Sequence, residues 1–507
     1  MTSTVDHIAT NAITEREHYR MLIGGRWVEA SDGARFDSIN PFDGRHWADV
    51  PTATGQDVDA AVRAAREAFE NGPWAASTPA QRSAVLRKLG DLIAANADEL
   101  ARIQVLENGK LIREVGGQTR ALSGHCYFYA GVAETMHGQT VASSVPNMHV
   151  FTVREPIGVV AAITPWNSPL ALLLWKLCPA LAAGNTVVIK PSEVTPVSTV
   201  KLGELITAAG IPDGVVNIVT GAGPTGAALA GHPGVDKVAF TGSTAVGKAI
   251  AVTTAERLAR VSLELGGKSP NIVFPDADTA NTVNGVIAGV FAATGQTCMA
   301  GSRVLVHQDI YDEFAEALAA RVRTIRIGDP LDPETEMGTV ACRPQYEKVL
   351  SYIEIAESEG ATLLAGGRKP SDPALAAGLF VEPAVFTGVT NDMRIAQEEV
   401  FGPVVVLIPF ADEDDAVRIA NDTRFGLAAG VWTNDIARAL RMVRRLRAGT
   451  VWVNNYRKTN YVAPFGGFKE SGIGRENGAD AVNEYTELKT VWIDMGNKIT
   501  DPFNPRA

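Results

Sequence analysis

The chain has 507 residues, of which 46% are hydrophobic and 20% charged. A chain of this length is too long to fold around a single hydrophobic core, so we predict two or three globular domains. The net charge of −11 argues against nucleic acid or an anionic membrane as a partner, because phosphate binding needs clustered Lys and Arg.

The N-terminal 20 residues are polar and lack the apolar segment of a signal peptide, so we expect a loose tail there. The longest apolar stretch, 170–183, is interrupted by Lys176 and Pro179 and is too short to cross a bilayer. The four cysteines are far apart and form no CxxC pair, which gives no support to a disulfide framework or a metal site. We therefore expect a reduced, cytoplasmic protein.

Apolar residues recur at helical spacing in 56–69 and 79–94. Between residues 159 and 266, short β-branched runs then alternate with helical patterns. The expected strands are 159–163, 186–189, 215–219, 237–240 and 261–265, and the expected helices are 197–209, 226–231 and 245–256. Apolar strands linked by helices predict a parallel sheet covered on both faces. Dinucleotides bind such sheets at the C-terminal ends of the strands.

A second alternating stretch runs from about residue 271 to 453 and predicts a second α/β domain. It contains the expected strands 271–274 and 303–306 and the expected helices 279–293 and 310–325. The basic cluster 438–447 has helical spacing and predicts a solvated helix face. Residues 138–154 and 487–493 alternate polar and apolar side chains without a helical period. We expect strands there that leave the main domains and serve a subunit contact.

The sharpest chemical signal is Gly295-Gln296-Thr297-Cys298, which follows an apolar helical pattern. A cysteine among small and polar neighbours can expose its sulfur to an electrophile, and the thiolate is the reactive form. Core packing is the usual role of an isolated cysteine, and we expect it for Cys126, Cys178 and Cys342.

Two further clusters suit the same chemistry. Glu264 stands between Leu263 and Leu265 at a strand end, where desolvation would raise its pKa toward that of a general base. An edge-strand glutamate facing water is the alternative. Asn167, in Pro165-Trp166-Asn167, follows the first strand and can aim its amide at a developing oxyanion. A simple turn between two prolines is equally compatible with the local sequence.

Three strand-to-helix junctions suit a dinucleotide. Gly242 and Ser243 follow a strand and open a helix, whose free N–H groups suit a pyrophosphate. Lys190 can hold a ribose or phosphate, and Glu193 can accept from a ribose 2′-hydroxyl and would repel a 2′-phosphate. A third junction has a literal GxGxxG from residue 221 to 226, but it is a lax pattern interrupted by Pro224.

Together these motifs resemble the NAD(P)-dependent aldehyde dehydrogenase superfamily, in its hydrolytic form. They occur in one dense order from about residue 160 to 475, and Gly24-Gly25-x-Trp27 with Asn40-Pro41 is similar to the family's start. The matching motifs are Pro165-Trp166-Asn167, Lys190 with Glu193, 240–247, Glu264 to Gly267, Gly295-Gln296-x-Cys298, 398–403 and Pro464-Phe465-Gly466-Gly467-Phe468-Lys469-x-Ser471-Gly472.

The resemblance implies the roles of these residues. Cys298 would be the nucleophile, Asn167 and the Cys298 N–H would hold the oxyanion, and Glu264 would activate water to hydrolyse a thioester. The residues implied at the cofactor are Ile163, Trp166, Lys190, Glu193, Gly223, Phe240, Gly242, Ser243, Val246, Leu265, Glu399 and Phe401. The residues implied at the substrate are Ser168, Leu172, Trp175, Thr297, Met299, Thr459, Tyr461 and Phe465. No metal is implied.

The implied fold is two Rossmann-like domains with a small β element for oligomerisation. We assign residues 1–137 and 157–266 to an NAD(P)-binding domain, 267–475 to a catalytic domain, and 138–156 with 476–507 to the oligomerisation element. NAD is the expected cofactor, because Glu193 disfavours NADP, although family members with this pattern also accept NADP. A homodimer or homotetramer is expected.

The substrate is the open question. Leu172, Trp175 and Phe465 favour a medium or bulky apolar aldehyde. Arg457 and Lys458 could attract an acidic semialdehyde, but a solvated tunnel rim is our preferred interpretation of them. Two alternatives are a CoA-acylating or succinic-type semialdehyde dehydrogenase and a binding protein that kept the fold without activity. Glu264 argues against CoA as the acyl acceptor, and the intact set of Cys298, Glu264, Asn167 and Lys190 argues against lost activity.

Overall fold

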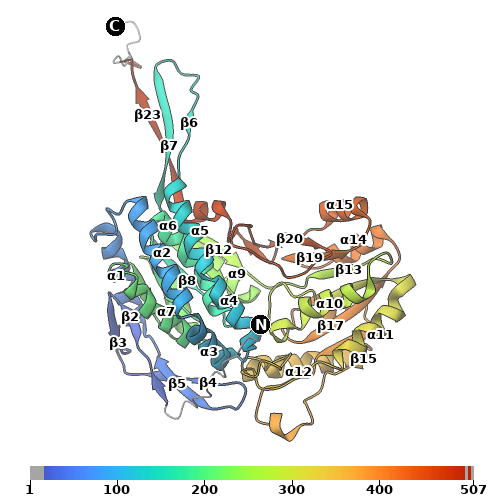
Figure 1. Ribbon diagram of the computed structural model, residues 1–507. Helices are drawn as coiled ribbons and strands as arrows, with labels where there is room; N and C mark the ends of the chain where they lie inside the picture. The colour runs from blue at the N-terminus through green and yellow to red at the C-terminus, as the bar shows by residue number, and fades with distance from the viewer. Residues whose placement is uncertain (1–15, 497–500, 504–507) are drawn as a thin grey trace, which may run out of the picture.

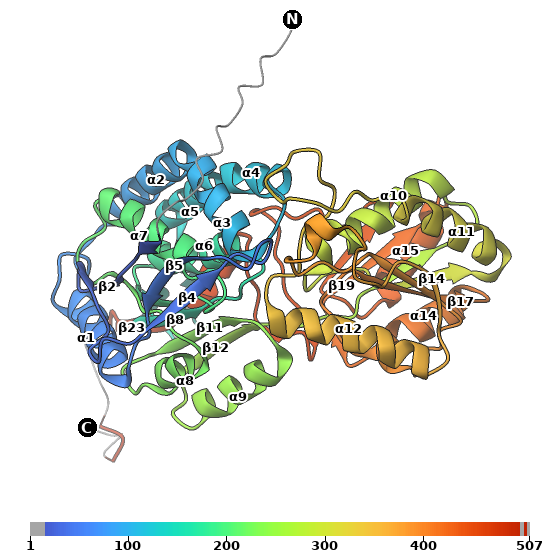
Figure 2. The ribbon, with the colours of Figure 1, turned by 90° about the horizontal axis from the view of Figure 1, so that it is seen from below.

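Two parallel sheets, each covered by helices on both faces, lie side by side in the computed structural model, which describes residues 16–496 and 501–503 (Figure 1). Seen from below, the N-terminal and C-terminal halves form separate lobes (Figure 2). The predicted fold class is confirmed. Most of the predicted tail lies outside the described residues, but Glu17–His18 forms a short strand, β1, paired with β5 (His46–Pro51), so the prediction of a loose tail is wrong for these two residues.

The first sheet has eight strands in the order β22-β12-β11-β8-β9-β10-β2-β3. Their bounds are Gly472–Ile473, Arg260–Glu264, Lys237–Thr241, Val159–Ile163, Thr186–Lys190, Val216–Ile218, Met21–Ile23 and Arg26–Val28. The five predicted strands are its parallel centre. From β8 the chain adds β9 on one side and later β11 on the other, so a crevice opens at the carboxyl ends of β8 and β11. Ligands bind open α/β sheets at such a point.

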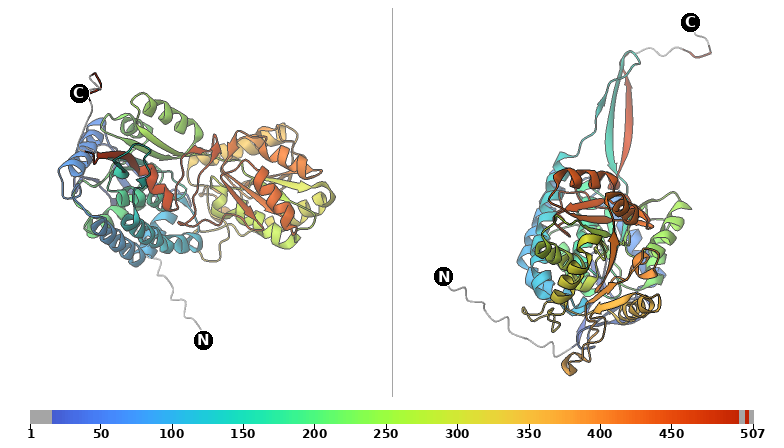
Figure 3. Two further views of the ribbon diagram at one scale, coloured as in Figure 1. Left: turned by 90° about the horizontal axis from the view of Figure 1, so that it is seen from above. Right: turned by 90° about the vertical axis from the view of Figure 1, so that its right-hand side faces the viewer.

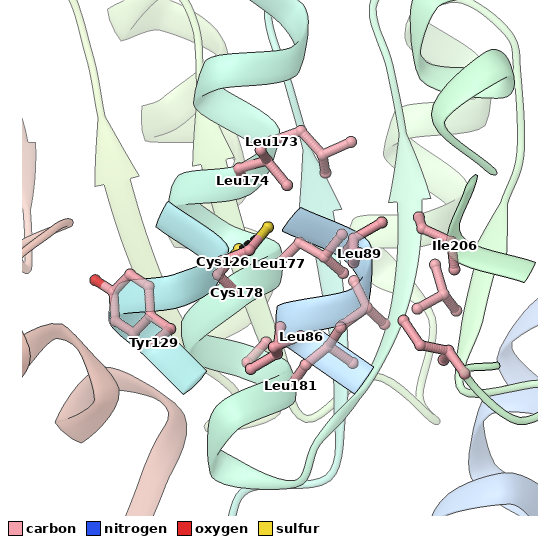
Figure 4. Close-up of a cluster of buried hydrophobic side chains, with 14 of the residues drawn as sticks. Leu86, Leu89, Cys126, Tyr129, Leu173, Leu174, Leu177, Cys178, Leu181 and Ile206 are labelled. Atoms are coloured by element: carbon pink, nitrogen blue, oxygen red, sulfur yellow. Dashed lines mark hydrogen bonds between the residues drawn. The ribbon is translucent and has the colours of Figure 1, made fainter. Parts of the chain in front are cut away.

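Helices cover both faces of this sheet. One face carries α2 (Pro79–Ala95), α5 (Ser123–Thr135), α6 (Pro169–Ala183) and α7 (Val197–Ala208). Leucines of α2 and α6 pack there with Cys126 and Tyr129 of α5, Cys178 of α6 and Ile206 of α7 (Figure 4). The other face carries α1 (Gly55–Glu70), α8 (Gly223–Gly231) and α9 (Thr244–Ala255). Cover on both sides explains why the central strands are apolar throughout.

The second sheet has seven strands in the order β15-β16-β17-β14-β13-β19-β20. Their bounds are Thr362–Ala365, Ala384–Thr387, Val404–Phe410, Arg303–His307, Pro270–Val273, Ala428–Trp432 and Thr450–Val453. One face is covered by α10 (Thr279–Val290) and α11 (Tyr311–Val322), the other by α12 (Arg343–Ser358), α14 (Glu413–Asn421) and α15 (Ile436–Arg445). The basic cluster is the exposed face of α15, as predicted, where Arg441 pairs with Glu413.

A three-stranded antiparallel arm stands away from the body (Figures 1 and 3). It consists of β6 (Thr140–Val141), β7 (Met148–Pro156) and β23 (Thr486–Asp494), so the two segments predicted to leave the domains form one sheet. Leu488 and Trp492 of β23 are 55% and 57% exposed. A smaller sheet of β1, β5 and β4 (Arg35–Ile39) lies under the first domain.

The segment after residue 465 joins the two large domains. Its strand β21 (Phe468–Lys469) pairs with β18 (Phe425–Gly426), whereas β22 pairs with β12 of the first sheet. Between them the buried Ser471 hydroxyl accepts from the Gly426 N–H, at 2.9 Å, and donates to the Gly266 carbonyl, at 2.7 Å. Residues 472–473, which we assigned to the catalytic domain, thus extend the first sheet.

Candidate active site

Two cavities meet at Cys298. The first, with about 590 Å³ of open space, lies at the crevice above β8 and β11. The predicted residues that line it are Trp166, Asn167, Gly242, Ser243, Glu264, Leu265, Cys298, Glu399 and Phe401. The second has about 1070 Å³, and all eight predicted substrate residues line it: Ser168, Leu172, Trp175, Thr297, Met299, Thr459, Tyr461 and Phe465. Asn167, Leu172 and Cys298 belong to both walls, so a molecule in either cavity reaches the sulfur.

A strained turn presents Cys298. The predicted helix 279–293 ends early, at Val290, because Ala293 and Thr294 adopt left-handed backbone with φ of 53° and 55°. Gly295 follows at φ 71°, and a Cβ there would lie 2.0 Å from the Gly402 carbonyl oxygen. Left-handed backbone costs free energy at residues other than glycine, and strain of this kind is frequent at functional sites. Only glycine fits the third position.

Side-chain amides and a carboxylate fix this turn. The Glu114 carboxylate accepts from the Ala293 N–H. The Gln296 Oε1 accepts from the Ala341 N–H, at 2.9 Å, and its Nε2 donates to the Thr339 carbonyl, at 3.3 Å. The glutamine of the motif therefore anchors the loop to the second domain, which explains its place two residues before the cysteine.

Asn167 connects the first domain to the same loop. It follows β8, is buried, and donates from Nδ2 to the Gln296 carbonyl, at 2.9 Å. The amide therefore does more than turn the chain between prolines. Its position on the wall shared by both cavities brings it to the surroundings of the sulfur.

The Cys298 thiol rests protonated in this environment. Burial, followed by the negative charges of Glu399 and Glu264, raises the pKa of the thiol to about 12. A base or a change of charge in the cleft must therefore accompany formation of the thiolate. Of the other cysteines, Cys126 and Cys178 are buried as predicted, whereas Cys342 is half-buried at the start of α12, so core packing is wrong for Cys342.

Glu264 is a buried carboxyl without a partner. It ends β12, is 4% exposed, and among the residues the structure describes neither of its carboxylate oxygens has a hydrogen-bond partner. Burial, together with the charge of Glu476, raises the pKa of Glu264 well above its ordinary value. The water-facing alternative is excluded, because β22 covers this edge. Nearby, the buried Lys176 ammonium donates to Glu476, at 2.5 Å, and to Thr241, at 2.6 Å.

The first cavity has the shape and donors that suit a dinucleotide. Gly242 follows β11, and the Ser243 hydroxyl caps α9 by accepting from the Val246 N–H. Both residues line the cavity, so the N-terminus of α9, which favours an anionic group, borders it. The Trp166 and Phe401 rings meet edge to face at 5.2 Å. Across the cleft Glu399 accepts from the Gly267 N–H, at 3.0 Å, and a Cβ at Gly266 would collide with it. The donor set fits an anionic cofactor with hydroxyl groups.

The other predicted cofactor residues do not line this cavity. Ile163 and Phe240 are buried in the core beneath it. Lys190, at the end of β9, lies 3.5 Å from the half-exposed Glu193 carboxylate. Gly223 begins α8, and Val246 is exposed on α9. These four residues extend the candidate site along the carboxyl edge of the sheet.

Sequence reasoning missed several lining residues. Gln345 and Lys348 reach the first cavity from α12, where the Gln345 amide donates to the Val400 and Phe401 carbonyls. Gln118 and His125 reach the second cavity from α4 (Ile112–Ala121) and α5. Each stands alone on a helix far from any motif, and one sequence carries no local signal for them.

The interpretation of Arg457 and Lys458 as a solvated rim is half wrong. Lys458 is exposed, as expected. Arg457 is half-buried, lines the substrate cavity together with Cys298, and has left-handed backbone with φ of 66°. The sequence of this short loop does not indicate that Arg457 lines the cavity whereas the next residue, Lys458, is exposed.

Within 16–496 and 501–503, no cluster of three His, Cys, Asp or Glu side chains is arranged to hold a metal ion. In the same residues, no helix combines the length and apolar character needed to cross a membrane.

Comparison with known proteins gives one answer. The model of the aldehyde dehydrogenase family matches residues 27–491. A betaine aldehyde dehydrogenase from Brucella anthropi is 44% identical, over 95% of this chain and 98% of its own length. A (Z)-2-((N-methylformamido)methylene)-5-hydroxybutyrolactone dehydrogenase from Acinetobacter baylyi is 44% identical, over 96% and 99%. The NAD+ complex of an aldehyde dehydrogenase from Bacillus cereus superposes with a TM-score of 0.92 at 46% identity, covering 94% of this chain and 97% of that one. The chain belongs to the aldehyde dehydrogenase family.

Proposed function

We propose that this protein oxidises an aldehyde to the carboxylic acid with NAD+, through a thioester on Cys298. The observation that carries the proposal is the meeting of two cavities at one sulfur, with Asn167 on both walls and the unpartnered Glu264 carboxyl on one. One cavity would hold the cofactor and the other the aldehyde.

The covalent step begins when the Cys298 sulfur adds to the aldehyde carbon. The thiol loses its proton to water in the cleft as the carbon–sulfur bond forms, and the carbonyl oxygen becomes an alkoxide. The Asn167 amide and the Cys298 backbone N–H stabilise that oxygen. NAD+ supplies the acceptor for the hydride that leaves the carbon, and this oxidation gives the thioester. A free aldehyde is a poor hydride donor, so covalent attack divides one hard step into easier ones.

Hydrolysis completes the cycle. Glu264 takes a proton from water, the resulting hydroxide adds to the thioester carbonyl, and the C–S bond breaks to release the acid and the thiolate. A raised pKa suits the carboxylate to this role, because a stronger base removes the proton more readily near neutral pH. A base at this position supports water as the acyl acceptor in preference to CoA. An inactive binding protein would have no need of it.

NAD+ is the preferred cofactor of this proposal. The Lys190 ammonium and Glu193 carboxylate stand together beyond the end of β9, where Glu193 would accept from a ribose 2′-hydroxyl and repel a 2′-phosphate. Trp166, Gly242, Ser243, Glu399 and Phe401 would contact the rest of the dinucleotide. The NAD+ complex of the Bacillus cereus relative supports this assignment.

The substrate we propose is an aldehyde with a medium or bulky apolar body. Leu172, Trp175 and Phe465 form a buried apolar cluster beside Cys298. The named substrates of the two curated relatives differ in charge. Betaine aldehyde is a cation, whereas a 5-hydroxybutyrolactone opens to an aldehyde that bears a carboxylate.

We also propose that the arm mediates assembly into a homodimer or homotetramer. Leu488 and Trp492 expose apolar area on β23 that a partner would cover.

Rapid-mixing kinetics with NAD+ and a panel of aldehydes test the function. Cys298→Ala should form no NADH above background. Glu264→Gln should give about one equivalent of NADH per site in a burst and then turn over slowly, because acylation outruns hydrolysis. Cys342→Ala, which alters a thiol outside both cavities, should behave as wild type. Undiminished turnover by Cys298→Ala would overturn the proposal.

A further inference from the structure

Arg457 is a cation in the wall of the substrate cavity. The residues that line the outer part of this cavity, such as Gln118 and Thr459, are exposed, whereas Leu172 and Phe465 near the sulfur are buried. Arg457 is half-buried, lines the same cavity as Cys298 and interacts electrostatically with it. The side chain therefore borders the space that the body of an aldehyde attached to Cys298 would occupy.

The Arg457 guanidinium has no direct partner among residues 16–496 and 501–503, since none accepts a hydrogen bond from it or forms an ion pair with it. Burial lowers the pKa of Arg457, and the charge of Glu114, which acts on it from a distance, raises that pKa by less. The neighbouring carboxylate, Glu114, is engaged by the Ala293 N–H at the turn before Cys298. An arginine donates five hydrogen bonds in a planar fork, and a sheltered cation without a partner costs free energy.

A second cation adds to the positive charge. Lys110 is buried behind the cavity and donates from Nζ to Gln118 and Ser168, both at 3.2 Å and both part of the cavity wall. Burial lowers the pKa of Lys110 to about 8, so its ammonium form still predominates at neutral pH. Two cations thus face one carboxylate, Glu114, which leaves this side of the cavity with a net positive charge.

The backbone supports a functional role for Arg457. Its φ of 66° places a long, Cβ-bearing residue in the left-handed region, which costs about 1–2 kcal/mol relative to ordinary backbone. Asparagine or glycine would adopt this conformation with less strain. Backbone strain of this kind persists where the surrounding structure fixes it and is frequent at ligand-binding sites.

We propose that Arg457 recognises a carboxylate carried by the substrate, so that the protein acts on aldehydes with an anionic group at the end remote from the carbonyl. This inference rests on the proposed function and narrows its substrate class. The guanidinium fork would bind both carboxylate oxygens, as arginine does in bidentate pairs. Leu172, Trp175 and Phe465 would contact the apolar body, and Cys298 would attack the aldehyde carbon.

Matched substrates test the proposal on the unaltered protein. We would compare 4-carboxybenzaldehyde with methyl 4-formylbenzoate, which keeps the shape but lacks the charge, and glutaric semialdehyde with pentanal. Betaine aldehyde supplies the cationic arm. The expected result is a kcat/KM about ten- to hundredfold higher for each acid than for its neutral counterpart, mainly through KM, with betaine aldehyde poorest.

Variants connect the preference to the residue. Arg457→Met should lose about ten- to hundredfold in kcat/KM for the acids and leave the neutral aldehydes within about twofold. Arg457→Lys should recover part of the preference, because a lysine keeps the charge without the fork. Lys458→Met removes the same charge from the exposed neighbour and should behave as wild type, and thermal melting of each variant reports its folding.

The outcomes separate the two proposals. If no aldehyde is oxidised by the wild-type protein, the proposed function itself fails. If kcat/KM is the same for the neutral aldehydes as for the acids, or is highest for betaine aldehyde, the proposed function stands and the role of Arg457 is refuted. An equal loss for acids and neutral aldehydes in Arg457→Met would also refute it, since it would mean that the arginine serves only the reacting centre or the loop.

Discussion

The Asn167 side-chain amide donates a hydrogen bond to the backbone carbonyl of Gln296, 2.9 Å away and two residues before Cys298. The bond joins the loop after β8, in the first domain, to the loop that carries the nucleophile in the second. It occupies one of the two Nδ2 hydrogens, which leaves the other for the oxygen of the substrate. In the proposed mechanism, one amide both positions the reactive loop and stabilises the oxyanion.

Asn167→Ala should remove both contributions. Loss of an oxyanion donor typically lowers kcat by about 100- to 1000-fold, and loss of a buried hydrogen bond costs about 1 kcal/mol of stability. Steady-state NADH formation and urea denaturation measure the two effects. Asn281→Ala, at an exposed position of α10 outside both cavities, is the control and should behave as wild type. Turnover within twofold of wild type in Asn167→Ala would contradict the assigned role.

Gly295→Ala should be far more damaging than the same change at Gly210. Both glycines have positive φ, of 71° and 83°, but a Cβ at Gly295 would lie 2.0 Å from a backbone oxygen, whereas Gly210 has open space around it. We expect about 1 kcal/mol of destabilisation from Gly210→Ala and roughly 3 kcal/mol or more from Gly295→Ala, because overpacking adds to backbone strain. Equal urea midpoints for the two variants would show that the turn before Cys298 yields easily.

His125 should make the protein sensitive to acid. Burial lowers the pKa of His125 to about 4, from an ordinary value near 6.5, and neither ring nitrogen has a hydrogen-bond partner among the described residues. Between pH 6.5 and pH 4, His125 therefore binds a proton in the unfolded chain but not in the folded chain. Stability falls as the pH drops from 6.5 to 4, by up to about 3 kcal/mol.

His125→Phe should flatten this dependence, since a phenyl ring keeps the packing against Trp175 and Tyr461 and binds no proton. Urea midpoints at pH 7, 6 and 5 provide the measurement. His149→Gln, an exposed histidine of the arm, should leave the wild-type slope unchanged. Parallel curves for wild type and His125→Phe would exclude the buried histidine as the source.

Alkylation of Cys298 should be slow at neutral pH. With a pKa of about 12, the thiolate fraction and the rate with iodoacetamide rise about tenfold per pH unit from 7 to 10. Glu399→Gln removes a negative charge that holds this pKa up, so it should accelerate the reaction. A Cys342→Ala background removes the other half-buried thiol. A rate that is flat above pH 7 would indicate a thiolate already formed.

Charges on the arm should disrupt assembly without unfolding the body. Leu488→Glu and Trp492→Glu place a carboxylate on exposed apolar positions of β23, and we expect a lower mass in light scattering with unchanged circular dichroism. Leu440→Glu makes the same change at a 55% exposed position of α15 and should keep the wild-type mass. Unchanged mass in all three variants would exclude the arm as an interface.

The sequence was most informative where local pattern and tertiary environment agree. The central strands of the first sheet are apolar because both faces are covered, so their runs could be located within about a residue. The resemblance supplied Cys298, Glu264 and Asn167, and the residues expected around the substrate line one cavity.

Other features depend on how the chain is arranged in space. The left-handed turn at Ala293 and Thr294 is stabilised by Glu114, which lies 179 residues earlier. His125 and Arg457 come from segments that carry no motif, and their lack of hydrogen-bond partners among the described residues is a property of the assembled cavity. No periodicity in one sequence reveals such relationships.

Ser471 has a consequence for how ligands come and go. Its hydroxyl is hydrogen-bonded to both Gly426 and Gly266, and the strands on either side of it, β21 and β22, pair with different sheets. These bonds between the two domains oppose a hinge motion that would move the domains apart. We therefore expect ligands to enter and leave through movements of loops and side chains, with little change in the relative placement of the two domains.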